Sequence, residues 1–306
     1  FIITEYHKIV NCNLFKNLTL GINPKLFTSN QIKKFFLKNN NVKIIKDDLI
    51  IKGYEKKLDH LKPFFSLDKN IVGESHQKKI NKIIPFLKKN KSDLIFITAP
   101  ENVAWLLNIR GYDNPNSPIP NCHLLLDYKK NLFLIANKRK VKNLIKEKKV
   151  IPSQIIDPNK FQLFVKKLNG DKIIIDPKTC SLFNENILKT KFRVLSKEDP
   201  IYMLKAIKNK KEIKNMISAH ISDGIALTKF LYWIKNVNKK KITEFDAQNK
   251  LEAFRKLNDK YMFPSFNTIA GSGENGAIVH YRATKKKSKK IKKKDIFLCD
   301  SGGQYK

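Results

Sequence analysis

Two side chains near the end of the sequence, a histidine and an aspartate, are of types that can do chemistry and stand close to glycines. His280 follows the apolar run Ala277-Ile278-Val279, and Asp300 follows Ile296-Phe297-Leu298-Cys299 and precedes two glycines. An imidazole can hydrogen-bond a substrate near neutral pH, and a carboxylate can bind a hard divalent cation. The glycines beside both residues leave room for a ligand. His280 and Asp300 are therefore the candidate site residues.

We expect strands to carry both residues. The run from Ala277 to Tyr281 alternates as a strand does, and Ile296 to Cys299 is a second strand-like run. If these runs pair antiparallel across the loop between them, His280 and Asp300 point to the same side of one sheet. A histidine on a strand and an aspartate at a strand end also occur for purely structural reasons. Neither residue taken singly defines a site.

A glycine-rich segment before His280, Gly271-Ser272-Gly273-Glu274-Asn275-Gly276, has the pattern G-x-G-x-x-G. Dinucleotide binding requires a strand before this pattern and a helix after it, so that the helix N-terminus meets the phosphates. Here the expected continuation is the strand from Ala277. The segment therefore does not predict nucleotide binding.

The composition favours a cytoplasmic protein that does not span a membrane. In the 306 residues, of which 42% are hydrophobic, no run approaches the roughly 20 apolar residues that a membrane helix needs. No signal peptide is recognisable at the start. The four cysteines lie far apart without a CxxC pair, and we expect reduced thiols (Cys12, Cys122, Cys180 and Cys299).

The net charge of +35 raises the question of an anionic partner. Only five of the 62 basic residues are arginine, the residue on which nucleic-acid readers depend for bidentate contacts. The sequence is also rich in Asn, Ile and Phe, which share A/T-rich codons with Lys. We therefore attribute the charge to composition rather than to nucleic acid, and expect Lys285 to Lys294 to form a solvated loop.

The elements around the candidate residues indicate mixed architecture. Strands and helices alternate over residues 76–195, including a predicted hairpin of 122–126 with 131–135, a helix near 138–147 and a strand at Val150-Ile151, which indicates an α/β domain. Two amphipathic helices follow, near 209–237 and 243–260. Thr243 with Asp246 forms a near capping box at the start of the second. On the first, we expect His220 to be packed within the apolar stripe. The fold class is therefore α/β followed by α+β.

Longer stretches resemble the X-prolyl aminopeptidase (aminopeptidase P) family. The resemblance is carried by Phe266 to Gly271, Glu274 to Tyr281 and Asp300 to Tyr305. It extends upstream through five further segments (Gly21 to Phe27, Gly73 to Ser75, Ala104 to Gly111, Pro200 to Glu212 and Ala219 to Gly224). These stretches cover nearly the whole chain in the family's order.

The resemblance implies a three-domain organisation. Residues 1–75 are similar to the tail of a first creatinase N-like domain and residues 76–195 to a second such domain. Residues 196–306 are similar to the first half of a "pita-bread" peptidase domain. The implied activity is metal-dependent hydrolysis of the N-terminal residue from peptides with proline second. A homodimer is also implied.

By the same resemblance, His280 contacts the substrate and Asp300 is the first aspartate of a metal site. The family uses two divalent ions, usually manganese, held by two aspartates, one histidine and two glutamates. Hard carboxylate oxygens suit manganese, and two ions can polarise the scissile carbonyl. A proline nitrogen has no N–H, so such an enzyme must recognise the ring and the free N-terminus.

The sequence departs from the family pattern at its end. The second aspartate, the histidine and both glutamates have no counterpart before Lys306. We therefore expect this chain to be an inactive fragment. Two alternatives stay open: a non-catalytic pita-bread module that binds proteins, and a lysine-rich nucleic-acid binder.

Overall fold

The computed structural model describes residues 8, 16–45, 62–238 and 242–306. The chain divides into two compact units. Unit 1 comprises the described residues within 1–66, 74–111 and 120–207, and unit 2 comprises those within 67–73, 112–119 and 208–306. In the described part, no helix is both long and apolar enough to cross a bilayer.

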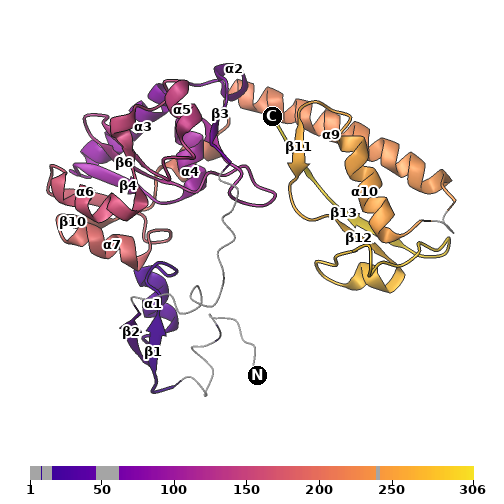
Figure 1. The fold of residues 1–306 in the computed structure, drawn as a ribbon, viewed down its shortest axis with the longest axis horizontal. Helices are drawn as coiled ribbons and strands as arrows, with labels where there is room; N and C mark the ends of the chain where they lie inside the picture. The colour runs from indigo at the N-terminus through magenta and orange to yellow at the C-terminus, as the bar shows by residue number, and fades with distance from the viewer. Residues whose placement is uncertain (1–7, 9–15, 46–61, 239–241) are drawn as a thin grey trace. The chain divides into compact units, whose positions relative to one another are not determined.

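Unit 1 is built on a six-stranded mixed sheet (Figure 1). Its strands, in spatial order, are β10 (Arg193–Ser196), β9 (Lys172–Ile175), β4 (Leu94–Ile97), β6 (His123–Asp127), β7 (Leu132–Ile135) and β8 (Ile155–Ile156). β10, β9 and β4 are parallel, whereas β6 runs antiparallel to both β4 and β7. The predicted hairpin is confirmed, since β6 and β7 pair directly.

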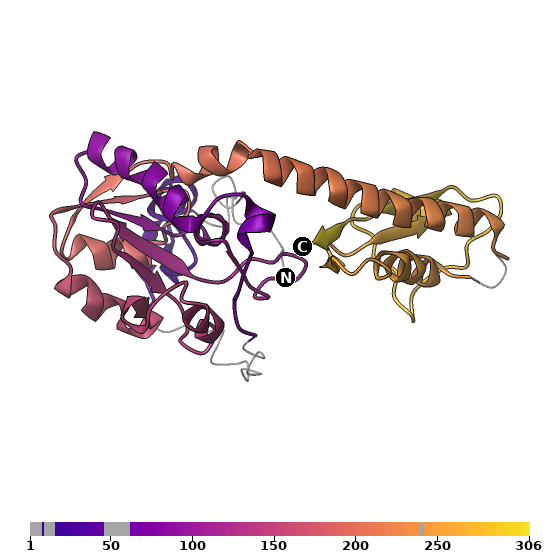
Figure 2. The same cartoon turned by 90° about the horizontal axis from the view of Figure 1, so that it is seen from above.

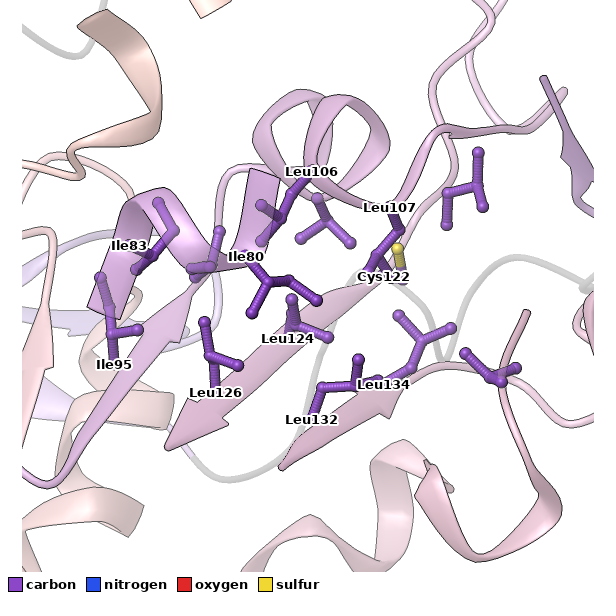
Figure 3. Close-up of a cluster of buried hydrophobic side chains, with 14 of the residues drawn as sticks. Ile80, Ile83, Ile95, Leu106, Leu107, Cys122, Leu124, Leu126, Leu132 and Leu134 are labelled. Atoms are coloured by element: carbon purple, nitrogen blue, oxygen red, sulfur yellow. The ribbon is translucent and has the colours of Figure 1, made fainter. Parts of the chain in front are cut away.

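Helices cover both faces of this sheet because its central strands are apolar on both faces. Ile95 and Ile97 of β4 pack into one core. Figure 3 shows Ile95 in this core together with Leu124 of β6 and Leu106 of the flanking helix α4. Leu94 and Phe96 pack into a second core on the other side. The first core is covered by α3 (His76–Lys89), α4 (Pro100–Leu107), α5 (Lys142–Lys146) and α8 (Ile201–Ala206), and the second by α6 (Phe161–Lys167) and α7 (Leu182–Lys189).

A smaller βαβ element extends unit 1. β1 (Thr19–Ile22) and β2 (Asn41–Ile44) are parallel and are joined by α1 (Ser29–Phe35). The Leu182 amide of α7 donates to the Phe27 carbonyl at 2.8 Å, which ties this element to the larger sheet. A two-stranded sheet of β3 (Phe65–Ser66) and β5 (Ile109–Arg110) completes unit 1.

Unit 2 consists of two helices packed on short antiparallel strands. α9 (Lys210–Asn236) and α10 (Glu244–Arg255) lie side by side, as Figures 1 and 2 both show. Phe230 and Ile234 of α9 pack against Ala247 and Leu251 of α10. The strand pairs are β12 (Ile269–Ser272) with β13 (Phe297–Asp300), and β11 (Tyr261–Pro264) with β14 (Gly303–Tyr305). The short α2 (Lys69–Val72) packs against α9.

The predicted mixed α/β architecture is confirmed, and several element boundaries are corrected. Val150-Ile151 is not a strand, because Pro152 starts a 3-10 turn and the pairing moves to β8. The helix predicted near 138–147 begins at Lys142, and the one predicted for 243–260 ends at Arg255. The capping box of Thr243 and Asp246 is present. The three-domain division stays a prediction.

The predicted packing of His220 is wrong. His220 is exposed on α9, and its Nδ1 lies 2.9 Å from the Met216 carbonyl one turn earlier. Ile217 and Ile221 on the same stripe are 56% and 60% exposed. The helix packs through Ala226, Phe230 and Ile234 instead, so the spacing identified a helix but not its buried face.

Among the cysteines that the structure describes, Cys122 and Cys180 are buried and Cys299 is half-buried, and no disulfide joins them. Cys12 lies outside the described residues, and reduced thiols stay a prediction. Burial raises the pKa of the Cys180 thiol to about 12, so this thiol is protonated at neutral pH.

Candidate functional site

His280 does not lie on a strand, contrary to the sequence prediction. Residues 273–277 form a 3-10 turn, and His280 follows in a turn with a left-handed φ of 58°. The chain folds back over Gly271, where an added Cβ would lie 2.8 Å from the backbone of Asn275. This close approach closes a turn at the point where the alternating pattern predicted a strand. The partner of β13 is therefore β12, which precedes the turn.

Asp300 occupies the last position of β13, as predicted. Phe297 and Cys299 of this strand pack against the core between α9 and α10, whereas Leu298 and Asp300 are exposed. Asp300 pairs with Ile269 in the β12–β13 register. The strand alternation thus directs the Asp300 carboxylate away from the unit 2 core, where a ligand could reach it.

His280 and Asp300 are not brought together by strand pairing. Both are exposed and both belong to the region around the β12–β13 pair. The structure instead fixes the backbone near each of them by a separate buried polar network. Each network is built on a carboxylate that the sequence analysis did not single out.

The first network surrounds Glu244, a fully buried residue at the start of α10. Its carboxylate accepts hydrogen bonds from the backbone amides of Ser272 at 2.7 Å and Lys289 at 2.9 Å. It also accepts from Asn275 Nδ2 at 3.0 Å and from the Tyr281 hydroxyl at 2.7 Å. These four donors come from both sides of His280.

The charge state of Glu244 follows from these contacts. Burial alone would raise the pKa of this carboxyl, but the hydrogen bonds from Lys289, Ser272, Asn275 and Tyr281 outweigh burial and lower it. Glu244 is therefore ionised at neutral pH. Burial and the bond to this carboxylate raise the pKa of Tyr281 to about 12, so the phenol stays a donor.

The second network surrounds Arg255, which is 2% exposed at the end of α10. Its Nε donates to Asp223 Oδ1 at 2.7 Å, and one terminal nitrogen donates to Asp223 Oδ2 at 3.1 Å. The same nitrogen donates at 3.1 Å to the Oγ of Ser301, the residue that follows Asp300. The Tyr305 hydroxyl donates to Asp223 Oδ1 at 2.7 Å. The end of the chain is thus held against α9 and α10.

Sequence reasoning missed these networks for a definable reason. Glu244 is the first residue of α10, directly after its predicted cap Thr243, a position at which an acidic residue only suggests favourable interaction with the helix dipole. Its four donors lie 28 to 45 residues further along the chain. For the second network, the sequence offered one local signal: Arg255 is an arginine in a sequence whose basic residues are mostly lysines.

The lysine-rich loop is exposed at its lysines, as predicted. Lys285, Lys286 and Lys287 lie in a solvated bend. Its second half is attached, however, since Ile291 is 3% exposed and its amide donates to the Ile242 carbonyl at 3.1 Å. The loop therefore covers the start of α10 in addition to presenting charge.

The described residues do not by themselves form a two-metal site. Asp300 offers the hard oxygen donor that manganese or magnesium prefers. No group of three or more His, Cys, Asp or Glu side chains that could hold a metal ion occurs among the residues that the structure describes. One carboxylate cannot satisfy the coordination of a single divalent ion, and still less of two.

Comparison with known protein families divides the chain into two matching regions. Residues 55–212, more than half of the chain, match the creatinase/prolidase N-terminal domain. Residues 214–306 match metallopeptidase family M24. The chain thus has a creatinase N-like domain followed by residues of a pita-bread peptidase domain, as predicted from the sequence.

Individual relatives define the family more narrowly. An Xaa-Pro aminopeptidase of Drosophila melanogaster is 33% identical over 76% of this chain and 39% of its own length. Xaa-Pro aminopeptidase 1 of Dictyostelium discoideum is 32% identical over 96% of this chain and 49% of its own length. The chain belongs to the X-prolyl aminopeptidase (aminopeptidase P) family, and it spans about half the length of the curated relatives it matches.

Solved structures show the same fold. A Caenorhabditis elegans X-prolyl aminopeptidase, described as a cytosolic enzyme with a di-nuclear active site, superposes with a TM-score of 0.84 at 24% identity. The match covers 99% of this chain and 51% of that one. Prolidase from Pyrococcus furiosus matches with a TM-score of 0.53 at 25% identity, over 72% of this chain and 61% of that one.

Proposed function

We propose that this chain is part of an X-prolyl metallo-aminopeptidase that removes the N-terminal residue from peptides with proline in second position. Support comes from the family relationship and from Asp300, whose exposed carboxylate ends a strand that packs on a core through Phe297 and Cys299. An ionisable side chain held by a rigid strand and reachable from solvent is the arrangement that a metal ligand needs. This placement of Asp300 carries the proposal.

His280 has a separate proposed role, as a hydrogen-bonding group for the substrate near the scissile bond. Its side chain is exposed, and the turn that carries it is anchored to α10 through Tyr281 and Asn275. A substrate with proline second has no N–H at the scissile nitrogen. Recognition then depends on the ring, the free N-terminus and contacts such as the one proposed for His280.

The proposed cofactor is a pair of divalent ions, with manganese as the metal. When bound, such ions supply Lewis acidity to the scissile carbonyl. Asp300 contributes one carboxylate to that site, and the other ligands are contributed by residues of the full-length gene product. We also propose that the 306-residue chain alone is inactive, that the protein is cytoplasmic, and that it forms a homodimer.

The test uses the full-length gene product with an X-Pro-containing peptide and added manganese. The wild-type protein should release the first residue. Asp300→Ala should lower kcat/KM roughly 1,000-fold, because metal assistance contributes several kcal/mol to transition-state stabilisation. Asp259→Ala, at an exposed aspartate in a unit 2 turn, is the matched control and should retain activity.

Three outcomes would overturn the assignment. Unchanged activity of Asp300→Ala would remove this residue from the metal site. A wild-type protein that is folded but inactive with every divalent ion would favour the non-catalytic binding module. Salt-sensitive binding of the wild-type protein to nucleic acid, without peptidase activity, would favour the lysine-rich nucleic-acid binder instead.

A further inference from the structure

The buried carboxylate of Glu244 holds both flanks of the segment that carries His280. Before His280, the donors are the Ser272 amide and the Asn275 side chain. After it, they are the Tyr281 hydroxyl and the Lys289 amide. A single side chain of α10 is therefore the common acceptor for a loop that otherwise projects its central residues into solvent.

The acceptor capacity of Glu244 is used within the protein. Oε1 accepts from Ser272 and Asn275, and Oε2 accepts from Tyr281 and Lys289. An ionised carboxylate has about four lone-pair sites, so these contacts leave none for a metal ion or a substrate. Because Glu244 is also 0% exposed, it cannot act as a further ligand. Its effect has to pass through the loop.

The backbone of His280 needs such support. Its φ of 58° lies in the left-handed region, which a side chain with a Cβ occupies only when the surrounding structure imposes it. The Tyr281 amide donates to the Ile278 carbonyl at 3.1 Å and closes the turn. The Tyr281 hydroxyl then fixes this turn to Glu244. The conformation of residue 280 is thus coupled to α10 through the residue that follows it.

We propose that Glu244 is the positioning residue for His280, and that it acts by holding the turn from Ser272 to Lys289 in the geometry that presents the imidazole. The proposal rests on the substrate-contacting role proposed for His280. The structural part does not depend on activity. It concerns the loop alone and can be measured on the 306-residue chain.

The first experiment measures amide hydrogen exchange of that chain. In Glu244→Gln, an NH₂ group replaces one carboxylate oxygen. This donor then faces the N–H and O–H donors that the oxygen had accepted from. At least one of the Ser272 and Lys289 amides should exchange at least about ten times faster than in the wild type, because they bind different oxygens of Glu244 and only one oxygen remains in the variant. Glu252→Gln, on the same helix in a surface pair with Lys256, should leave both rates unchanged. Equal rates in Glu244→Gln and the wild type would overturn the proposal.

The second experiment is a double-mutant cycle in the full-length enzyme. Glu244→Gln should lower kcat/KM about 10- to 100-fold, by analogy with the loss of a residue that supports a metal ligand. In a His280→Ala background, the same substitution should cause little further loss, since its effect passes through the imidazole. If the two losses multiply, Glu244 stabilises the fold without positioning His280, and the proposal is wrong.

A milder variant covers the case in which Glu244→Gln does not fold. Tyr281→Phe removes one donor and keeps the ring, and it should lower kcat/KM about 3- to 10-fold in the wild-type background and not in His280→Ala. A loss of the same size in both backgrounds would contradict the proposal. Full activity of His280→Ala would instead refute the proposed role of His280, while the hydrogen-exchange result would still report on the loop.

Discussion

Arg255 and Asp223 form a two-point ion pair between α10 and α9. The guanidinium Nε and one terminal nitrogen reach the two carboxylate oxygens at 2.7 and 3.1 Å. Burial opposes ionisation of both groups, but their mutual hydrogen bonds outweigh it, so the pKa of Asp223 is lowered and the pKa of Arg255 is raised. Through Ser301, this pair fixes the chain beside Asp300.

The first prediction concerns the stability of unit 2. Asp223→Asn should lower its free energy of unfolding by about 3 kcal/mol, because the buried Arg255 loses its counter-charge. Arg255→Lys should cost about 2 kcal/mol, since an ammonium group cannot make the two-point contact. Urea unfolding can be followed by Trp233 fluorescence in a Trp105→Phe background, which removes the other tryptophan of the sequence.

The neighbouring pair supplies the control. Lys256 and Glu252 approach to 2.8 Å on the same helix, but their side chains are 64% and 32% exposed. Lys256→Ala should therefore change stability by no more than about 0.5 kcal/mol. Similar losses for Lys256→Ala and Arg255→Lys would mean that the burial of the Arg255 pair has no energetic consequence.

A second prediction is loss of unit 2 stability in acid. The pKa values of Glu244 and Asp223 are lowered in the folded protein from ordinary values of 4.5 and 3.8. Their contribution is therefore complete above the unfolded pKa values and is lost as the pH falls through the lower, folded ones. The free energy of unfolding should be flat from pH 7 to about 5 and then fall.

Glu244→Gln should make this acid slope shallower, because the substituted residue does not take up a proton. Glu198→Gln, at an exposed carboxylate of unit 1 that pairs with Lys178, should leave the slope of unit 2 unchanged. A wild-type slope in Glu244→Gln would show that this carboxylate does not titrate on acid unfolding. Chemical denaturation at a series of pH values provides the measurement.

The left-handed backbone at His280 leads to a third prediction. His280→Gly should be more stable than His280→Ala by about 1 kcal/mol, because glycine adopts a positive φ without a Cβ penalty. At His220, inside α9, the order should reverse, with alanine favoured over glycine by about 1 kcal/mol. Thermal unfolding of the four variants gives the comparison. The same sign at both positions would refute the conformation assigned to His280.

Gly271 and Gly224 provide a fourth prediction. An added Cβ at Gly271 would lie 2.8 Å from backbone atoms of Asn275 and Gly276, which cannot move independently of the turn. Gly271→Ala should therefore cost about 2 kcal/mol or more. A Cβ at Gly224, inside α9, meets nothing within 4 Å, and Gly224→Ala should stabilise the helix by about 0.5–1 kcal/mol. Urea unfolding of both variants gives the measurement. If neither substitution changed the free energy of unfolding, the backbone contact at Gly271 would be wrong.

The sequence by itself determined the local elements and the family. Hydrophobic periodicity placed the β6–β7 hairpin and α9 nearly as observed, because each forms from contacts among residues close in the chain. The cap of α10 was likewise predicted from Thr243 and Asp246. The position of Asp300 at a strand end followed from the apolar run before it.

Tertiary structure decided how His280 and Asp300 are held. Alternation predicted a strand around His280, but the close approach at Gly271 and the donors collected by Glu244 turn the chain there instead. Periodicity also left the buried face of α9 open, because that face depends on where α10 and β13 pack. Both outcomes rest on contacts between residues far apart in the chain, whose energies exceed the local preferences from which a sequence can be interpreted.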